Sequence, residues 1–197
     1  MNTPAARPLV LASTSPQRRA ILEQLGIPFE VVAPRYVEED GPGTDPVELV
    51  RAHAAGKAWS VLPAAGSRPV LGVDTAVVVG GEVFGKPRDE ADAAVMLERL
   101  GGRGHDVVSG LCLLADDRAS VGHAVTRVVF RSLPPGDLAR YVASGEWEGR
   151  AGGYAIQGRG AALVERIEGD YLNVVGLPAA LLVSLLRERF PGTYAIG

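Results

Sequence analysis

The chain has 197 residues, of which 47% are hydrophobic and 22% are charged, and its formal net charge is −3. This composition is that of a globular protein with an ample core, and the acidic balance argues against a broad nucleic-acid-binding surface. No apolar run reaches transmembrane length and residues 1–7 lack the pattern of a signal peptide, so we expect a soluble cytoplasmic protein with a flexible segment at 1–7.

Helical and strand-like patterns alternate along the whole chain, which indicates an α/β fold in a single domain. Helices are expected at 16–25, from 46 onward, 89–100, 137–144 and 178–190. Strands are expected at 8–12, 29–33, 70–79, 82–84, 105–114, 120–133, 154–157 and 161–167, and the first of them open the chain like a βαβ unit. Connecting segments are expected at 34–45, 63–69, 115–119 and 146–153.

The first functional signal is the passage from the strand at 8–12 into the helix at 16–25. Ser15 is the expected N-cap of this helix, and Pro16 is its first residue. A helix N-terminus offers free backbone N–H groups, and the neighbouring hydroxyls and arginines add donors for anionic oxygens, so a phosphate chain is the simplest ligand. The same residues are also typical of an ordinary strand-to-helix turn with surface arginines.

Lysine is scarce in this chain. Of the 20 basic residues, 18 are arginine, and the two lysines are Lys57 and Lys86. These two positions therefore favour a compact ammonium over the planar fork of a guanidinium, although chance retention explains two residues equally simply.

A single carboxylate, Asp74, interrupts the apolar strand at 70–79. A buried carboxylate needs a cation, a helix N-terminus or a metal ion as its partner, although an aspartate near a strand end can also satisfy a turn. Lys86 lies in the tight loop GKPRD at 85–89, which lacks the spacing of a Walker phosphate loop and so excludes a Walker-type NTPase. The alternative for Lys86 is a solvated loop lysine.

Five motifs follow one another along the chain: LASTSPQRR at 11–19, GVDT at 72–75, GKPRD at 85–89, AGGYAIQG at 151–158 and GDYLNVVGLP at 169–178. Together and in this order they resemble the motifs of the Maf family of nucleoside triphosphate pyrophosphatases. The resemblance covers Leu9 to about Arg189. It implies an elongated mixed sheet with flanking helices in two lobes around a cleft, related to the inosine-triphosphate pyrophosphatases.

The resemblance also implies the reaction, which is cleavage of a nucleoside triphosphate to the monophosphate and pyrophosphate with a divalent metal cation such as Mg²⁺ or Mn²⁺. It assigns catalytic roles to Asp74 as proton acceptor, Glu38, Lys57 and Lys86, phosphate contacts to Ser13 and Arg18, and the metal to Glu38 and Asp74. Glu39 stands beside Glu38, so the choice of carboxylate is open. The expected partner is a nucleotide, with neither nucleic acid nor membrane, and the family suggests a homodimer.

Base preference is expected to depend on Gln17, Thr75 and Gln157. The family branch that acts on dTTP and UTP typically has Arg, Thr and Gln at these positions, and the branch that acts on 7-methyl-GTP has Trp, Gln and Glu. Two of the three residues match the first branch, and none matches the second. Two residues depart from the family pattern: Gln17 stands where Arg is usual, and Gly56 stands where Glu is frequent.

Three alternatives remain open: a 7-methyl-GTP pyrophosphatase, an enzyme of broad nucleotide range, and a non-catalytic nucleotide-binding regulator of cell division. The histidines His53, His105 and His123 are expected to lie at the surface or in hydrogen bonds, because none pair at metal-ligand spacing. Asp170 and Asn173 are interpreted as capping residues as readily as catalytic ones.

Overall fold

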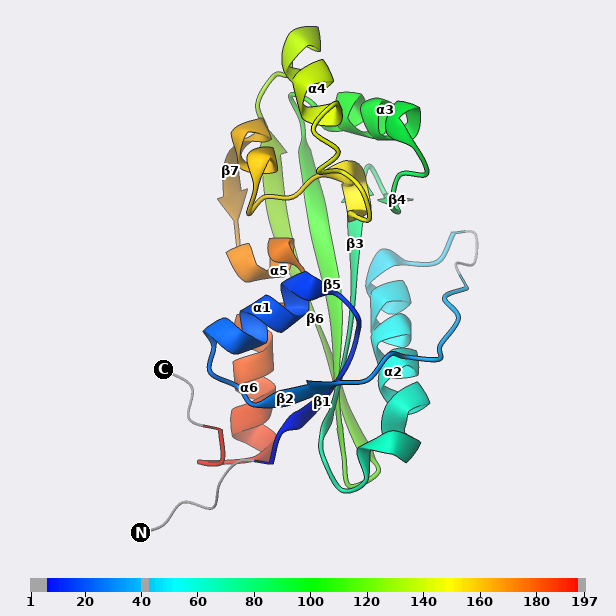
Figure 1. The fold of residues 1–197 in the computed structure, drawn as a ribbon, viewed down its shortest axis with the longest axis vertical. Helices are drawn as coiled ribbons and strands as arrows, with labels where there is room; N and C mark the ends of the chain where they lie inside the picture. The colour runs from blue at the N-terminus through cyan, green and yellow to red at the C-terminus, as the bar shows by residue number, and fades with distance from the viewer. Residues whose placement is uncertain (1–6, 40–42, 195–197) are drawn as a thin grey trace. The chain divides into compact units, whose positions relative to one another are not determined.

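The computed structural model describes residues 7–39 and 43–194 (Figure 1). Apart from Arg7, the segment expected to be flexible at 1–7 lies outside the described residues. The helices are α1 (Pro16–Gln24), α2 (Pro46–Ala65), α3 (Glu90–Leu100), α4 (Pro135–Val142), α5 (Tyr171–Val175) and α6 (Ala179–Arg189), with 3₁₀ turns η1 (Ala151–Gly153) and η2 (Arg159–Leu163). The strands are β1 (Leu9–Ala12), β2 (Phe29–Val31), β3 (Val70–Val79), β4 (Glu82–Phe84), β5 (Gly104–Ala115), β6 (Arg118–Phe130) and β7 (Val164–Glu168).

The strands of the described residues form one seven-stranded mixed sheet with the order β2-β1-β3-β5-β6-β7, and β4 pairs with β3. Strand β1 is parallel to both β2 and β3, which confirms the βαβ opening. Strands β3 and β4 form the expected hairpin across Gly80 and Gly81, whose φ angles of +57° and +85° suit glycine. The sheet and its flanking helices confirm the expected α/β class.

The chain divides into two compact units. The first contains the described residues within Met1–Asp74, Ser109–Ala124 and Gly176–Gly197, and the second contains Thr75–Val108 and Val125–Val175. Strands β3, β5 and β6 contribute residues to both units.

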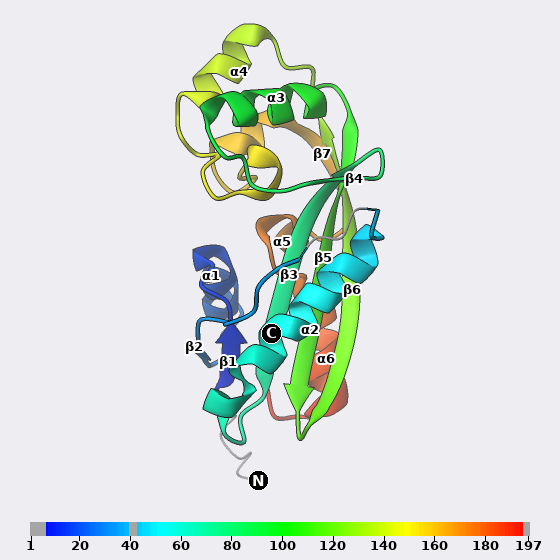
Figure 2. The same cartoon turned by 90° about the vertical axis from the view of Figure 1, so that its right-hand side faces the viewer.

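In the first unit, helix α2 lies against the backbones of the strands. A Cβ atom on Gly72 of β3 would lie 2.1 Å from the carbonyl oxygen of Ala54, and one on Gly110 of β5 would lie 2.1 Å from that of Val50. Both glycines therefore permit direct contact between helix and strand backbones. Figure 2 shows α2 running along β3 and β5. Buried residues of this unit gather here, namely Val10, Ala12, Ala54, Ala58, Val61, Ala65, Val70, Cys112 and Leu114.

The second unit has its own aromatic core. The rings of His105, Phe130 and Tyr154 meet edge to face, with centroids 4.8–5.4 Å apart. The Nε2 atom of His105 lies 2.8 Å from the hydroxyl of Tyr154. Burial, and to a smaller extent the nearby Arg127 charge, lowers the pKa of His105 to about 4.

Helix α2 differs from the prediction at its C-terminal end. It continues through Pro63 to Ala65, where a connector over 63–69 was expected, and it ends at Gly66 with φ +62°. Val61 and Ala65 are both buried in the core of the first unit. Their burial therefore outweighs the helix-breaking tendency of proline.

Three other expectations about elements are wrong. Residues 154–157 form no strand, because Gly152 and Gly153, with φ +69° and +72°, turn the chain just before them. Helix α4 begins at Pro135, and Asp137 instead pairs with Arg131 and Arg140.

The third wrong expectation concerns the segment before the last helix. This segment contains a helix, α5, that the sequence did not predict. Asp170 caps α5, because its Oδ1 accepts a 2.8 Å hydrogen bond from the N–H of Leu172, and of the two roles left open for it the structure therefore shows the capping contact. Asn173 lies inside α5 and does not cap: its side-chain N–H groups donate to the carbonyl of Val107 and the hydroxyl of Thr126.

No helix among the described residues combines the length and apolarity needed to cross a bilayer.

Candidate functional site

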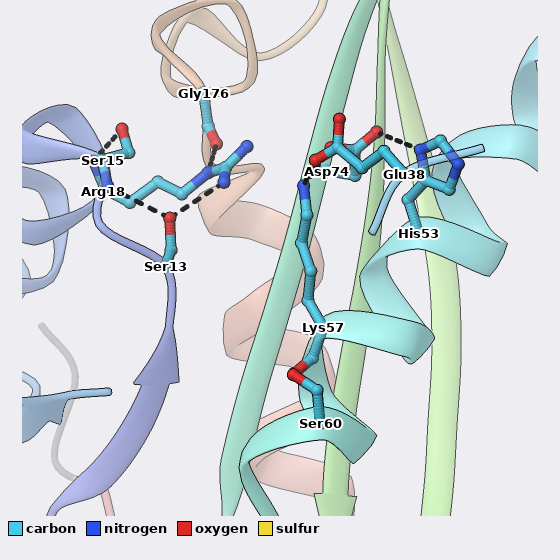
Figure 3. A network of polar contacts seen from close by, with 9 residues as sticks. All are labelled: Ser13, Ser15, Arg18, Glu38, His53, Lys57, Ser60, Asp74 and Gly176. Atoms are coloured by element: carbon cyan, nitrogen blue, oxygen red, sulfur yellow. Dashed lines mark hydrogen bonds and ion pairs between the residues drawn. The ribbon is translucent and has the colours of Figure 1, made fainter. Parts of the chain in front are cut away.

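The end of β1 and the start of α1 bring Ser13 and Arg18 together (Figure 3). The hydroxyl of Ser13, which is 4% exposed, accepts hydrogen bonds from the backbone N–H of Ser15 at 3.2 Å and from Nη1 of Arg18 at 3.0 Å. Nε of Arg18 donates to the carbonyl of Gly176 at 3.0 Å. Ser15 caps α1 as predicted, accepting from the N–H of Arg18. The guanidinium is thus held beside a helix N-terminus, where donors for anionic oxygens gather.

Lys57 of α2 joins two carboxylates from different parts of the first unit. Its Nζ lies 2.5 Å from Oδ1 of Asp74, on β3, and 2.5 Å from Oε1 of Glu38, in the segment before α2. The side chains of Lys57 and Asp74 are only 10% and 13% exposed, whereas that of Glu38 is 51% exposed. Of the two neighbouring glutamates, Glu38 is therefore the one that contacts Lys57.

The electrostatic field of the carboxylates also reaches Arg18. Burial lowers the pKa of Arg18, and the charges of Asp74 and Glu38 act in the opposite direction. Arg18, Lys57, Asp74 and Glu38 thus form one charged cluster in the first unit, in which Arg18 acts on the carboxylates through its charge. Figure 3 shows these four side chains together.

His53 is a member of this cluster that sequence reasoning missed. It is 3% exposed, and its Nδ1 lies 3.4 Å from Oδ2 of Asp74. Its expected hydrogen-bonded state fits this contact, but its place at the site was not foreseen. The available signal was its spacing: residues 53 and 57 lie one helical turn apart and share a face of α2.

Glu38, His53 and Asp74 form a group that can hold a metal ion. Each offers one ligand atom, and these atoms all lie within 4.8 Å of one another. The two carboxylate oxygens suit hard divalent cations such as Mg²⁺ and Mn²⁺, whereas the imidazole is a donor that softer cations prefer. The ammonium of Lys57 already contacts both carboxylates, so this place accepts positive charge.

The position of Gly56 in the fold explains why glycine occurs there. A Cβ atom there would lie 2.2 Å from Cε2 of Tyr36, whose ring covers that face of α2. The ring of Tyr36 also packs against His53, with centroids 5.7 Å apart. The space in which a longer side chain at 56 would lie is therefore filled by an aromatic ring.

The three expected base-preference residues are divided between the units. Gln17 belongs to the first unit, and its Oε1 accepts a 3.0 Å hydrogen bond from the hydroxyl of Ser15. Thr75, next to Asp74 on β3, and the exposed Gln157 belong to the second unit.

Lys86 is exposed in the loop that follows β4, also in the second unit. This loop is fixed by the carbonyl of Gly85, which accepts a 3.0 Å hydrogen bond from the N–H of Gly152 in η1. The segment after Gln157 is fixed by Glu146, whose carboxylate accepts from the N–H groups of Arg159 and Gly160, both at 2.9 Å.

Comparison with known proteins gives one family and several relatives. The family Maf, described as Maf-like protein, matches residues 8–189. A protein of Gloeobacter violaceus named dTTP/UTP pyrophosphatase is 47% identical over 180 residues, which cover 91% of this chain and 95% of the relative. A protein of the same name from Pelotomaculum thermopropionicum is 44% identical over 182 residues, with the same coverage. Among solved structures, the Staphylococcus aureus Ham1 protein overlaps 63% of this chain and 72% of its own, with 17% identity and a TM-score of 0.45.

Proposed function

Because the chain belongs to the Maf-like protein family, we propose that it hydrolyses nucleoside triphosphates to the monophosphate and pyrophosphate, with dTTP and UTP as preferred substrates. The observation that carries this proposal is the 44–47% identity, over 91% of the chain, to proteins named dTTP/UTP pyrophosphatase. The charged cluster supports it, because such a cluster can both bind phosphates and activate water.

In the proposed reaction, Asp74 accepts the proton of the water that attacks the α-phosphorus. Ser13 and Arg18 bind phosphate oxygens, and Lys57 and Lys86 stabilise the charge of the departing pyrophosphate. Phosphoryl transfer of this kind needs positioning and charge neutralisation and no covalent intermediate. The proximity of Asp74 and Lys57 supports this division of roles, because a cation lies beside the base.

Glu38 and Asp74 would hold a divalent metal ion, and His53 is within reach as a third ligand. When bound, such an ion would neutralise phosphate charge and supply Lewis acidity to the reaction. The two carboxylates that contact the ammonium of Lys57 support this assignment, since they already share a cation.

Base preference is assigned to Gln17, Thr75 and Gln157. The amide of Gln157 both donates and accepts, which suits the N3–H and carbonyl of thymine or uracil. Gln17 lacks the fixed charge of an arginine, and its Oε1 already accepts from Ser15, so the preference is expected to be soft. We expect each lost base contact to cost roughly 1–3 kcal/mol of discrimination.

The assay that tests the proposal compares kcat/KM for dTTP, UTP, CTP, GTP and 7-methyl-GTP, with chelation and re-addition of Mg²⁺ or Mn²⁺. Hydrolysis in ¹⁸O-water should label the monophosphate and not the pyrophosphate. Gln17→Arg should sharpen the pyrimidine preference, and Gln157→Glu should weaken it. A lead for 7-methyl-GTP, a flat profile, or binding without turnover would favour, respectively, the 7-methyl-GTP enzyme, the broad enzyme and the non-catalytic regulator.

The same proposal includes a single functional domain, a cytoplasmic location and a homodimer. The family match runs from residue 8 to residue 189 and so includes residues of both compact units. Sedimentation of the purified protein tests the homodimer, and a monomer at all concentrations would contradict it.

A further inference from the structure

Residues 34–38, which we call the strap, lie along α2 and are tied to it at both ends. The backbone N–H of Arg35 donates to the hydroxyl of Ser60 at 3.2 Å, and that hydroxyl donates to the carbonyl of Lys57 at 2.8 Å. Three residues later, the carboxylate of Glu38 contacts the ammonium of Lys57. Tyr36 lies between these two ties.

The ring of Tyr36 fits onto α2 at the one glycine in that helix. A Cβ atom on Gly56 would lie 2.2 Å from Cε2 and 2.6 Å from both Cδ2 and Cζ of the ring. Glycine inside a helix costs about 1 kcal/mol relative to alanine, so helix stability alone favours a side chain there. The ring contact explains why glycine occurs here despite its lower helix propensity, since any side chain at 56 would displace the ring.

The same ring touches the cluster from a second side. It packs at an interplanar angle of 61° against His53, whose Nδ1 faces Asp74. The ring thus contacts the residue beside Asp74, and its own backbone leads to Glu38 two residues later. Glu38 is half exposed, and without the strap its side chain and backbone would be free to leave Lys57.

We infer that Tyr36 is a positioning residue of the proposed hydrolysis: its ring, seated on Gly56 and His53, holds Glu38 at Lys57 and His53 at Asp74. This inference rests on the proposed function for its effect on turnover. Its structural half, that the ring holds the strap on α2, stands on the contacts alone.

The test uses full-length protein with four variants and one control. Tyr36→Ala removes the ring, Tyr36→Phe keeps it, Gly56→Ala displaces it, and the double variant Tyr36→Ala/Gly56→Ala combines both changes. Ala52→Gly, on the exposed face of α2 one turn earlier, controls for helix propensity. Two readouts are taken: hydrogen exchange at the Arg35 amide, and kcat and KM for dTTP at saturating metal.

Tyr36→Ala and Gly56→Ala should each speed exchange at Arg35 by about tenfold or more and lower kcat by roughly 10- to 100-fold, the usual effect of losing a supporting contact behind a ligand. KM should change little, because Ser13 and Arg18 are untouched. Tyr36→Phe and Ala52→Gly should keep both values. The double variant should be no worse than Tyr36→Ala, because the added methyl group then meets no ring.

Unchanged exchange in Tyr36→Ala would overturn the strap, and faster exchange with unchanged kcat would overturn its role in catalysis. Additive losses in the double variant would also contradict the inference, since Gly56 would then act without Tyr36. If the wild-type protein hydrolyses no triphosphate, the proposed function fails, while the exchange rates still decide whether the ring holds the strap.

Discussion

Lys57 is the residue at which the charges of the candidate site meet. Its ammonium is nearly buried and contacts two carboxylates that are far apart in the sequence, Glu38 and Asp74. Removing one member of such a group leaves another charge without its partner, which is costly in a buried place. Substitutions here must therefore be chosen to preserve charge balance or shape.

The first prediction concerns Asp74. Asp74→Asn keeps the size of the side chain and removes its capacity to accept a proton, so turnover should fall by roughly 100-fold or more. Nucleotide affinity, measured by calorimetry, should persist. Asp116→Asn, in an exposed turn, is the matched control and should be fully active. Near-normal pyrophosphate release by Asp74→Asn would remove this residue from the mechanism.

The second prediction concerns the two lysines. Lys57→Arg should lower kcat by ~100-fold, because a guanidinium fork cannot occupy the place of an ammonium 2.5 Å from two carboxylates without moving them. Lys86→Arg should also lower activity although it keeps the charge, because a planar fork cannot take the place of a point charge. The exposed Arg118→Lys is the control for exchange of cation type. Wild-type rates in both lysine variants would show that the scarcity of lysine carries no functional meaning.

At the residue scale, the sequence predicted those site residues that stand out chemically. Asp74 in an apolar strand, two lone lysines and the Ser15 cap are visible without a structure. His53 and Tyr36 were not found, because their importance lies in contacts with residues distant along the chain. The contact between Tyr36 and Gly56 spans 20 positions and leaves no local pattern.

At the scale of elements, the turns that contain glycine are the feature that the sequence predicts best. The Gly80-Gly81 hairpin agrees with the prediction. The turn between β5 and β6 is shorter than the five-residue connecting segment expected at 115–119. It consists of Asp116 and Asp117, with φ angles of +49° and +57°. Two aspartates in left-handed conformation are an uncommon choice for such a turn, which glycine usually occupies.

The third prediction follows from this turn. Asp117→Gly should raise the free energy of unfolding by about 0.5–1 kcal/mol, because glycine adopts positive φ without strain. Asp117→Ala should lower it, since alanine lacks both that freedom and a polar side chain. Urea denaturation of the three proteins measures the difference. Equal stability of the glycine and alanine variants would contradict the prediction.

Helix α2 and residues 154–157 illustrate why other elements were missed. Proline at 63 normally ends a helix, but burial of Val61 and Ala65 keeps this one intact. The apolar residues Tyr154, Ala155 and Ile156 are buried in an irregular segment, because two left-handed glycines precede them. In both cases tertiary packing decided the conformation, and local preference did not.

At the scale of the whole molecule, stability should depend on pH through His105. Its pKa is about 4 in the folded protein against an ordinary value of 6.5, and its Nδ1 has no partner among the described residues. Between these pH values the unfolded chain binds more protons than the folded one, so stability is lost as pH falls from 6.5 to 4.

The fourth prediction quantifies this loss. The shift corresponds to about 3 kcal/mol across the window. Free energies of unfolding measured at several pH values should therefore decline less steeply for His105→Gln than for the wild-type protein. His123→Gln, which removes an exposed histidine, should decline like the wild type. Parallel curves for wild type and His105→Gln would refute the assignment.

The glycine contacts beneath α2 have a consequence for how this sequence can change over evolution. At Gly72 and Gly110 the helix meets the strands backbone to backbone, with no side chain that could adopt another rotamer. The spacing between the backbone of α2, which carries Lys57, and that of β3, which carries Asp74, is therefore set by peptide groups and does not depend on which aliphatic residues surround them. The neighbouring core can exchange one small apolar residue for another over many generations without changing this spacing, whereas a single added carbon at either glycine would push the helix away from the strands.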